Sequence, residues 1–178
     1  MRILTTIFLI LLVVLVNSCS FLPASPPKWE PQKEGIVLHL KSDNKLNVEK
    51  GKAYTLYFVI YQLTSPNIFN QLSEDEEGLS KLLSSKIFDP SVTAVKSIVI
   101  YPGTDVTYKI DRAEGARYVG VVAGYRTMTK ERMVRLFDIP VHVKIDNVLK
   151  MTQKLAPGVL DIKLKLGPQQ IEKLKEKE

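Results

Sequence analysis

The only cysteine of this 178-residue chain, Cys19, ends an apolar N-terminal segment. Met1 and Arg2 precede a nearly unbroken apolar run over residues 3–16, and a small residue, Ser18, stands directly before the cysteine. A run of about fourteen apolar residues is short for a helix that must cross roughly 30 Å of hydrocarbon. The pattern predicts a bacterial lipoprotein signal over residues 1–18, whose removal leaves lipidated Cys19 as the first residue.

A lipid anchor and a lone cysteine together restrict what the rest of the chain can be. Each buried CH₂ of an acyl chain contributes about 0.8 kcal/mol, so several chains on one residue hold it to a membrane almost permanently. No second cysteine is present for a disulfide, so the core must be stable without one in an oxidising compartment. Ser20 stands where an aspartate would favour retention in the inner membrane. We therefore expect an outer-membrane protein that faces the periplasm, with an ordinary secretory signal or an uncleaved anchor as the alternative.

Composition divides the remaining chain into three parts. Residues 19–34 hold four prolines and predict a stiff, extended tether. We expect Trp29 to dock on the domain rather than at the lipid interface, since its burial contributes on the order of 2 kcal/mol. Residues 35–167 are predicted to form a single domain, and residues 168–178 a polar tail. Removal of Arg2 with the signal lowers the formal charge from +6 to +5, which favours anionic partners such as lipid headgroups, cell-wall polymer or an acidic protein surface, although solubility explains it equally well; we expect no nucleic acid in this compartment.

Strand patterns dominate the predicted domain. Residues 159–166 alternate apolar and charged positions, and residues 53–63 are apolar on both faces, as in a central strand. One short helix is expected after Ser73, which stands three residues before Glu76 with capping-box spacing. The sequence predicts an all-β, two-sheet sandwich with one short inserted helix. The other expected strands cover 36–41, 95–101 and 106–110 as a hairpin around Pro102 and Gly103, 118–126, and 133–145 with a break at Pro140.

Residues with catalytic potential are few. His39 and His142 are the only histidines and lack the spacing of a metal site, and no nucleophile elbow, phosphate loop or zinc motif occurs. The acidic run 74–77 is typical of a helix N-terminus. Tyr54, Tyr57, Phe58 and Tyr61 could form a ligand platform, although core packing at strand spacing is the more common reason for such a set. We expect no enzymatic activity, no metal and no cofactor.

Several motifs in order resemble a known family. They are Leu46-Asn47 with Gly51; Tyr61-Gln62-Leu63 with Phe69 and Leu72; Tyr101-Pro102-Gly103; and Arg117-Tyr118-Val119-Gly120-Val121-Val122-Ala123 with Tyr125-Arg126. Together with the cysteine motif, this set is similar to the TssJ-type outer-membrane lipoprotein of the bacterial type VI secretion system. The resemblance implies a transthyretin-like sandwich, no enzymatic activity and a structural role. It also implies a partner: the periplasmic region of a large inner-membrane subunit, which such lipoproteins bind to anchor the membrane complex.

The connection over residues 42–52 is longer than a hairpin needs and lies between two strong strands, so we expect it to bind the partner. The predicted contact residues are Lys45, Leu46, Asn47, Val48 and Gly51. The alternative is a solvated loop in which Asn47 and Gly51 serve turn geometry while Leu46 and Val48 tuck into the core. A different class also stays open: a lipoprotein that binds peptidoglycan or a small ligand, or a pilot for another envelope machine.

Overall fold

The computed structural model describes residues 25–147 and 152–172, so the signal, Cys19 and the first residues of the tether lie outside it. The chain divides into two compact units. Of the described residues, the larger unit comprises 27–142 and 156–172, and the smaller comprises 25–26, 143–147 and 152–155.

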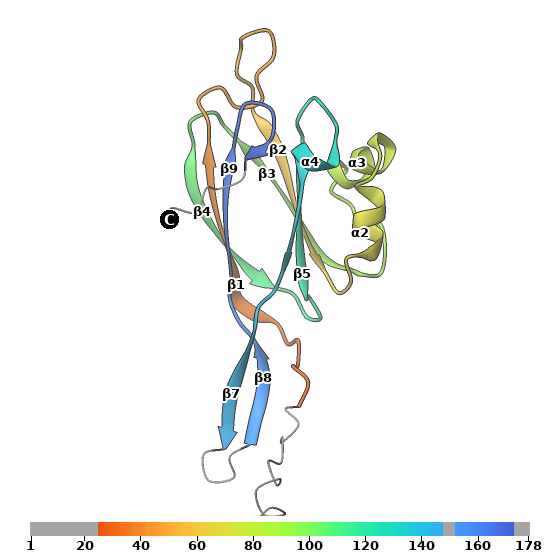
Figure 1. The fold of residues 1–178 in the computed structure, drawn as a ribbon, viewed down its shortest axis with the longest axis vertical. Coiled ribbons are helices and arrows are strands. Elements are labelled where there is room, and N and C mark those ends of the chain that lie inside the picture. The colour runs from red at the N-terminus through yellow and green to blue at the C-terminus, as the bar shows by residue number, and fades with distance from the viewer. Residues whose placement is uncertain (1–24, 148–151, 173–178) are drawn as a thin grey trace, which may run out of the picture. The chain divides into compact units, whose positions relative to one another are not determined.

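Two four-stranded sheets form the larger unit (Figure 1). The first has the order β10 (Ile171–Glu172), β9 (Leu160–Leu166), β1 (Gln32–Ser42) and β4 (Asp105–Arg112). The second has the order β3 (Val92–Ile100), β2 (Leu56–Leu63), β5 (Tyr118–Ala123) and β6 (Val134–Asp138). β1 runs parallel to β9 and antiparallel to β4. The predicted two-sheet sandwich is confirmed.

Strand β9 shows how the first sheet contributes to the core. Its residues alternate between buried leucine or isoleucine and exposed or half-exposed charged side chains, as the sequence predicts. Its neighbour β1 buries Ile36, Leu38 and Leu40 in the same way. Because successive side chains of a strand point to opposite faces, one face of this sheet packs in the core and the other meets water.

The centre of the second sheet is covered on both faces. Every residue of β2 from Phe58 to Leu63 is buried. Helices α2 (Asn67–Leu72) and α3 (Glu76–Leu83) lie over its outer face (Figure 1), where the Tyr61 hydroxyl donates to the carbonyl of Leu82. The Phe69 ring lies 5.9 Å from that of Tyr61. Gly120, the strand partner of Tyr61, leaves the room for it, because a Cβ there would approach the Phe69 ring to 2.5 Å.

The helical insertion differs from the prediction in two respects. It contains two helices rather than one, and a further short helix, α4 (Lys130–Met133), precedes β6. Ser73 does not begin a helix but ends α2, while the carboxylate of Asp75 caps α3 by accepting from the amide of Gly78 at 2.7 Å. The capping-box assignment was wrong because Asp75 is itself a good N-cap and lies two residues further on. Glu76 and Glu77 occupy the first turn of α3, as expected for the acidic run.

The predicted hairpin of residues 95–101 and 106–110 is wrong. β3 pairs with β2 and β4 pairs with β1, so the turn at Pro102 and Gly103 carries the chain from one sheet to the other. Ser42 fixes this crossing, since its hydroxyl donates to the carbonyl of Tyr101 at 2.7 Å and accepts from the amide of Thr104 at 2.8 Å. A turn signal shows where a chain reverses, but not which strand each arm will pair with.

Both ends of the predicted domain carry more structure than expected. Trp29 packs against the core, as predicted, with the guanidinium carbon of Arg112 5.5 Å from its ring centroid. Arg112 is buried, which lowers its pKa, and it donates to the carbonyl of Glu30 at 2.8 Å. β1 begins at Gln32, inside the range given to the tether, and β10 lies inside the range given to the polar tail.

The smaller unit contains most of a two-stranded sheet, β7 (Val141–Asn147) and β8 (Thr152–Pro157). The break at Pro140 is confirmed, since it separates β6 from β7. Ser25 forms a parallel bridge with Lys154 of β8. Among the helices in the described ranges, none has the length and apolar character required to cross a membrane.

Candidate functional site

The connection from β1 to β2 is a folded loop. The carboxylate of Asp43 accepts from the amide of Lys45 at 2.7 Å, and its carbonyl accepts from the amide of Leu46 at 3.0 Å. The carbonyl of Leu46 accepts in turn from the amide of Tyr54 at 3.0 Å. These bonds join the two arms of the loop, so its shape is set before any partner arrives.

The side chain of Leu46 holds the loop to the sandwich. It is 0% exposed and belongs to the main core cluster, so it cannot contact a partner. The partner-binding assignment of Leu46 is therefore wrong, because an apolar side chain in a polar loop gains more by entering the core than by facing water. Val48 is half-buried, and its amide donates to the carbonyl of Pro168 at 2.9 Å.

Asn47 and Gly51 set the backbone path of the loop. Asn47 has φ +48°, a left-handed conformation that asparagine tolerates well, and its amide group donates to the carbonyl of Thr55 at 3.0 Å. Glu49 and Lys52 exchange two backbone hydrogen bonds of 2.9 Å around Lys50 and Gly51, which have φ +46° and +78°. Two positive φ values at the centre of a turn typify type I′. A partner-binding role for Asn47, Val48 and Gly51 stays a prediction.

A tyrosine and an arginine flank the loop, and the sequence analysis did not bring them together. The guanidinium carbon of Arg126 lies 5.3 Å from the ring centroid of Tyr54, which is well exposed. Arg126 also forms an ion pair with Glu49, with 2.8 Å between Nη2 and Oε2. Tyrosine and arginine are enriched at the centres of protein interfaces, and this preference was the signal available in the sequence.

The expected aromatic platform is divided between surface and core. Phe58 and Tyr61 are buried on opposite faces of β2, whereas Tyr54 and Tyr57 are exposed. Tyr57 pairs with Val99 of β3, which is also exposed, and Tyr101 follows β3 with 64% of its surface exposed. Of these residues, Tyr54 and Tyr101 are hydrogen bonded to the loop, through Leu46 and Ser42, and are available to contact another protein.

Two other segments pack beside the loop: residues 125–127, which follow β5, and residues 167–169, which follow β9. The buried Tyr125 hydroxyl donates to the carbonyl of Gly167 at 3.2 Å. Burial raises the pKa of Tyr125 above its ordinary value, and the nearby carboxylate of Glu172 raises it further. A hollow of about 40 Å³ lies between the three segments, far too small for an ordinary ligand. It is lined by Asn47, Val48, Tyr125, Arg126, Thr127, Pro168 and Gln169.

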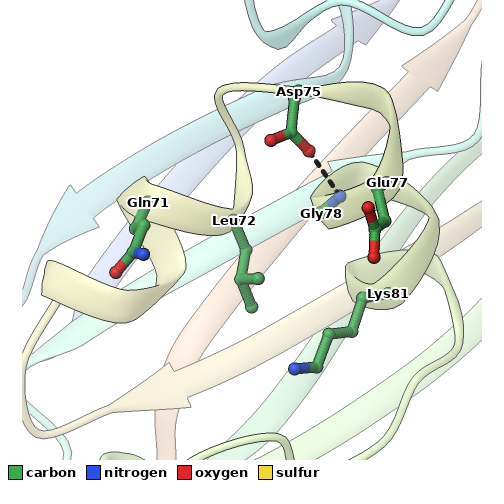
Figure 2. Close-up of a pocket in the computed structure, with 6 residues that line it drawn as sticks. All are labelled: Gln71, Leu72, Asp75, Glu77, Gly78 and Lys81. Carbon is green, nitrogen blue, oxygen red and sulfur yellow. Dashed lines mark hydrogen bonds between the residues drawn. The ribbon is translucent and has the colours of Figure 1, made fainter.

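A larger hollow of about 230 Å³ lies at the junction of α2 and α3 (Figure 2). Gly78 explains its local geometry, because a Cβ there would lie 2.1 Å from the carbonyl oxygen of Leu72. The glycine therefore permits the close approach of the two helices. The carboxylate of Asp75 already accepts a hydrogen bond from the amide of Gly78. Glu77 lies in the first turn of α3, where acidic residues stabilise a helix. Helix packing and capping thus account for these residues.

The two histidines have surface roles. His39 Nδ1 lies 2.8 Å from the hydroxyl of Thr107, and Nε2 lies 3.3 Å from the carboxylate of Asp161. His142 is exposed on β7. Within residues 25–147 and 152–172, no three potential metal ligands come together.

Comparison with known proteins places this fold in a family. The model of the family described as "Type VI secretion lipoprotein, VasD, EvfM, TssJ" matches residues 34–156. The chain belongs to the type VI secretion lipoprotein family. Its resemblance to TssJ-type proteins is therefore confirmed, and as a lipoprotein of this family it is anchored to a membrane by a lipid.

Solved structures share the fold at low sequence identity. The lipoprotein TssJ1 from Pseudomonas aeruginosa is 20% identical, with a TM-score of 0.55 over 86% of this chain and 99% of that one. Lip from Serratia marcescens, a membrane-bound type VI secretion component, is 18% identical, with a TM-score of 0.60 over 79% and 97%. A chain from the structure of the TssM C-terminal domain of EAEC is 15% identical, with a TM-score of 0.55 over 79% and 98%. No curated protein sequence matches the chain.

Proposed function

We propose that this chain is a non-enzymatic structural lipoprotein that anchors the type VI secretion membrane complex to the outer membrane. It does so by binding the periplasmic region of a large inner-membrane subunit. The observation that carries the proposal is the family match over residues 34–156. Similarity to chains in structures of a TssM C-terminal domain and of a type VI membrane complex supports a role in assembly.

The binding site that we propose is the tip surface, which comprises Lys45, Asn47, Val48, Tyr54, Tyr101 and Arg126. Its backbone is fixed by the hydrogen bonds of the loop and by buried Leu46, so little ordering entropy is lost on binding. Tyr54, Tyr101 and Arg126 supply the side-chain types that most often dominate binding energy.

Charge indicates the kind of surface that the partner presents. The loop and Arg126 together carry four basic residues, Lys45, Lys50, Lys52 and Arg126, against two acidic ones, Asp43 and Glu49. One of the four, Arg126, is paired with Glu49. The remaining lysines are exposed, so an acidic partner surface would complement them and speed association.

Titration of the mature chain, with Cys19→Ser for solubility, against the partner's periplasmic fragment tests the proposal. The variant Tyr54→Ala/Tyr101→Ala should weaken binding by about thirtyfold or more, since each substitution removes a large contact residue. The control Ile87→Ala/Val159→Ala removes exposed apolar side chains outside the tip surface and should bind normally. Equal affinities for the two double variants would contradict this binding site.

Membrane fractionation tests the anchor separately. The Cys19→Ser chain should be folded, soluble in the periplasm and inactive in secretion, because the lipid and the sandwich are separate parts of the chain. If it sediments with the outer membrane when the partner is absent, lipidation is not the anchor. Binding of peptidoglycan fragments by the isolated chain would favour the ligand-binding class instead.

A further inference from the structure

The strand β7 exposes an apolar side in the smaller unit. Val143 and Ile145 are 59% and 68% exposed, and they alternate with the exposed polar residues His142 and Lys144. Val141, at the start of the same strand, is also exposed. A two-stranded sheet is at best marginally stable alone, and a patterned apolar face on it is typical of a surface that meets another apolar phase.

Chain connectivity ties this hairpin to the lipid anchor. Ser25 bridges to Lys154 of β8, and the amide of Leu155 donates to the carbonyl of Ser25 at 3.4 Å. Ser25 follows Cys19 by six residues. A fully extended chain spans at most 3.3–3.6 Å per residue, so Ser25, which is bridged to β8, lies within about 22 Å of the lipidated residue. The membrane that holds the acyl chains is therefore within reach of the hairpin.

We propose that the β7–β8 hairpin lies against the membrane that anchors Cys19, with Val143 and Ile145 at the boundary between headgroups and acyl chains. Lys144 projects from the opposite face of β7 and would stay in water. Since the acyl chains already hold the protein, this contact orients the hairpin rather than anchoring it. The inference rests on lipidation at Cys19 and not on partner binding.

A fluorescent probe at position 145 tests this contact in the full lipidated protein. Cys19 is the only cysteine and its thiol carries the lipid, so Ile145→Cys introduces a single free thiol for an environment-sensitive fluorophore. In vesicles of phosphatidylethanolamine and phosphatidylglycerol, we expect a blue-shifted emission that brominated acyl chains quench. Ile87→Cys is the matched control, because Ile87 is 65% exposed but lies after α3 in the larger unit. Its probe should stay in water.

Second-site variants sharpen the result. With the probe at position 145, Val143→Ser should reduce quenching severalfold, whereas Val99→Ser, at another exposed valine, should not. Equal, unquenched emission from positions 145 and 87 would overturn the proposal. A blue shift that appears without vesicles and grows with protein concentration would overturn it too, because a second copy would then cover this face. The assay contains no partner, so its failure would leave the proposed function untouched.

Discussion

The loop between β1 and β2 and the β7–β8 hairpin both leave the two main sheets, yet they are stabilised in different ways. The loop places Leu46 in the core. Hydrogen bonds join its two arms to each other and join the loop to the segment after β9. The hairpin instead exposes Val143 and Ile145. The comparison teaches that one buried side chain can give a polar loop a fixed shape in isolation. A two-stranded ribbon that exposes Val143 and Ile145 gains most from the surface that it meets.

The largest effect should come from removing the side chain that distinguishes the two regions. Leu46→Ala should lower the free energy of unfolding by about 2–5 kcal/mol, because it leaves a cavity in a packed core. Val143→Ala should change it by less than about 0.5 kcal/mol, as at other exposed sites. Urea unfolding of the two variants checks this, and similar losses would mean that the loop is no better packed than the hairpin.

Asn47 tests the backbone of the loop. Asn47→Ala should cost about 1–2 kcal/mol, since alanine loses the bond to Thr55 and disfavours a positive φ. Asn47→Gly loses the bond but accepts the conformation, so its cost should be smaller. Thermal unfolding measures both. If the two variants are equally unstable, the left-handed conformation does not matter here.

The buried hydroxyl of Tyr125 should make the free energy of unfolding depend on pH. Its pKa is raised in the folded state, so the unfolded chain loses its proton first, near pH 10. The stabilisation is therefore present below about pH 10 and is lost as pH rises toward the folded pKa. Tyr125→Phe should cost about 1 kcal/mol at pH 7 through the lost bond to Gly167.

The same variant should show a shallower loss of stability between pH 9 and pH 11 than the parent chain. Denaturation midpoints over this range provide the measurement. Tyr61 is present in both proteins, and burial raises its pKa to about 12, so some loss of stability with rising pH remains in the variant. Parallel pH profiles would therefore exclude a part for Tyr125.

The smallest effect should have the opposite sign. Lys50 is a non-glycine residue at φ +46°, and Lys50→Gly should stabilise the turn by about 0.5 kcal/mol or leave it unchanged. Gly51→Ala at φ +78° should instead destabilise it by about 1 kcal/mol. Calorimetry of this pair checks the signs. A destabilising Lys50→Gly would show that the lysine side chain makes a contact that outweighs its backbone strain.

The sequence predicted elements whose pattern is local. Three features were predicted correctly: the alternating burial along β9, the burial of β2 on both faces, and the strand break at Pro140. The first two follow from the spacing of apolar residues along a strand, and the third follows from the missing N–H of proline. Strand pairing did not follow, because the turn at Gly103 has the same residues whether the chain closes a hairpin or crosses between sheets. The contact of Tyr54 with Arg126 was missed because it joins residues far apart in sequence.

The motifs that carried the family resemblance turn out to hold the architecture together. Gln62 bridges the two sheets: its side chain donates to the carbonyl of Asp111 at 2.9 Å and accepts from the amide of Ala113 at 2.7 Å. Gly120 makes room for Phe69 under the helices. Such residues predict the fold well and the contact surface poorly, because the fold constrains them whatever the chain binds. This explains why Leu46, chosen from one of these motifs, proved to be a core residue.

Strand β1 has a mechanical consequence if the proposed function holds. The tether enters at its first residue, and the loop that carries Lys45, Asn47 and Val48 of the tip surface follows its last, so tension passed from the membrane to a partner bound at this loop would act along the strand axis. β1 is flanked by β4 on one side and by parallel β9 on the other. Hydrogen bonds in such ladders lie across the strands, so an axial pull shears many of them at once instead of opening them one by one. The chain would then behave as a tensile link whose strongest direction coincides with the direction of load.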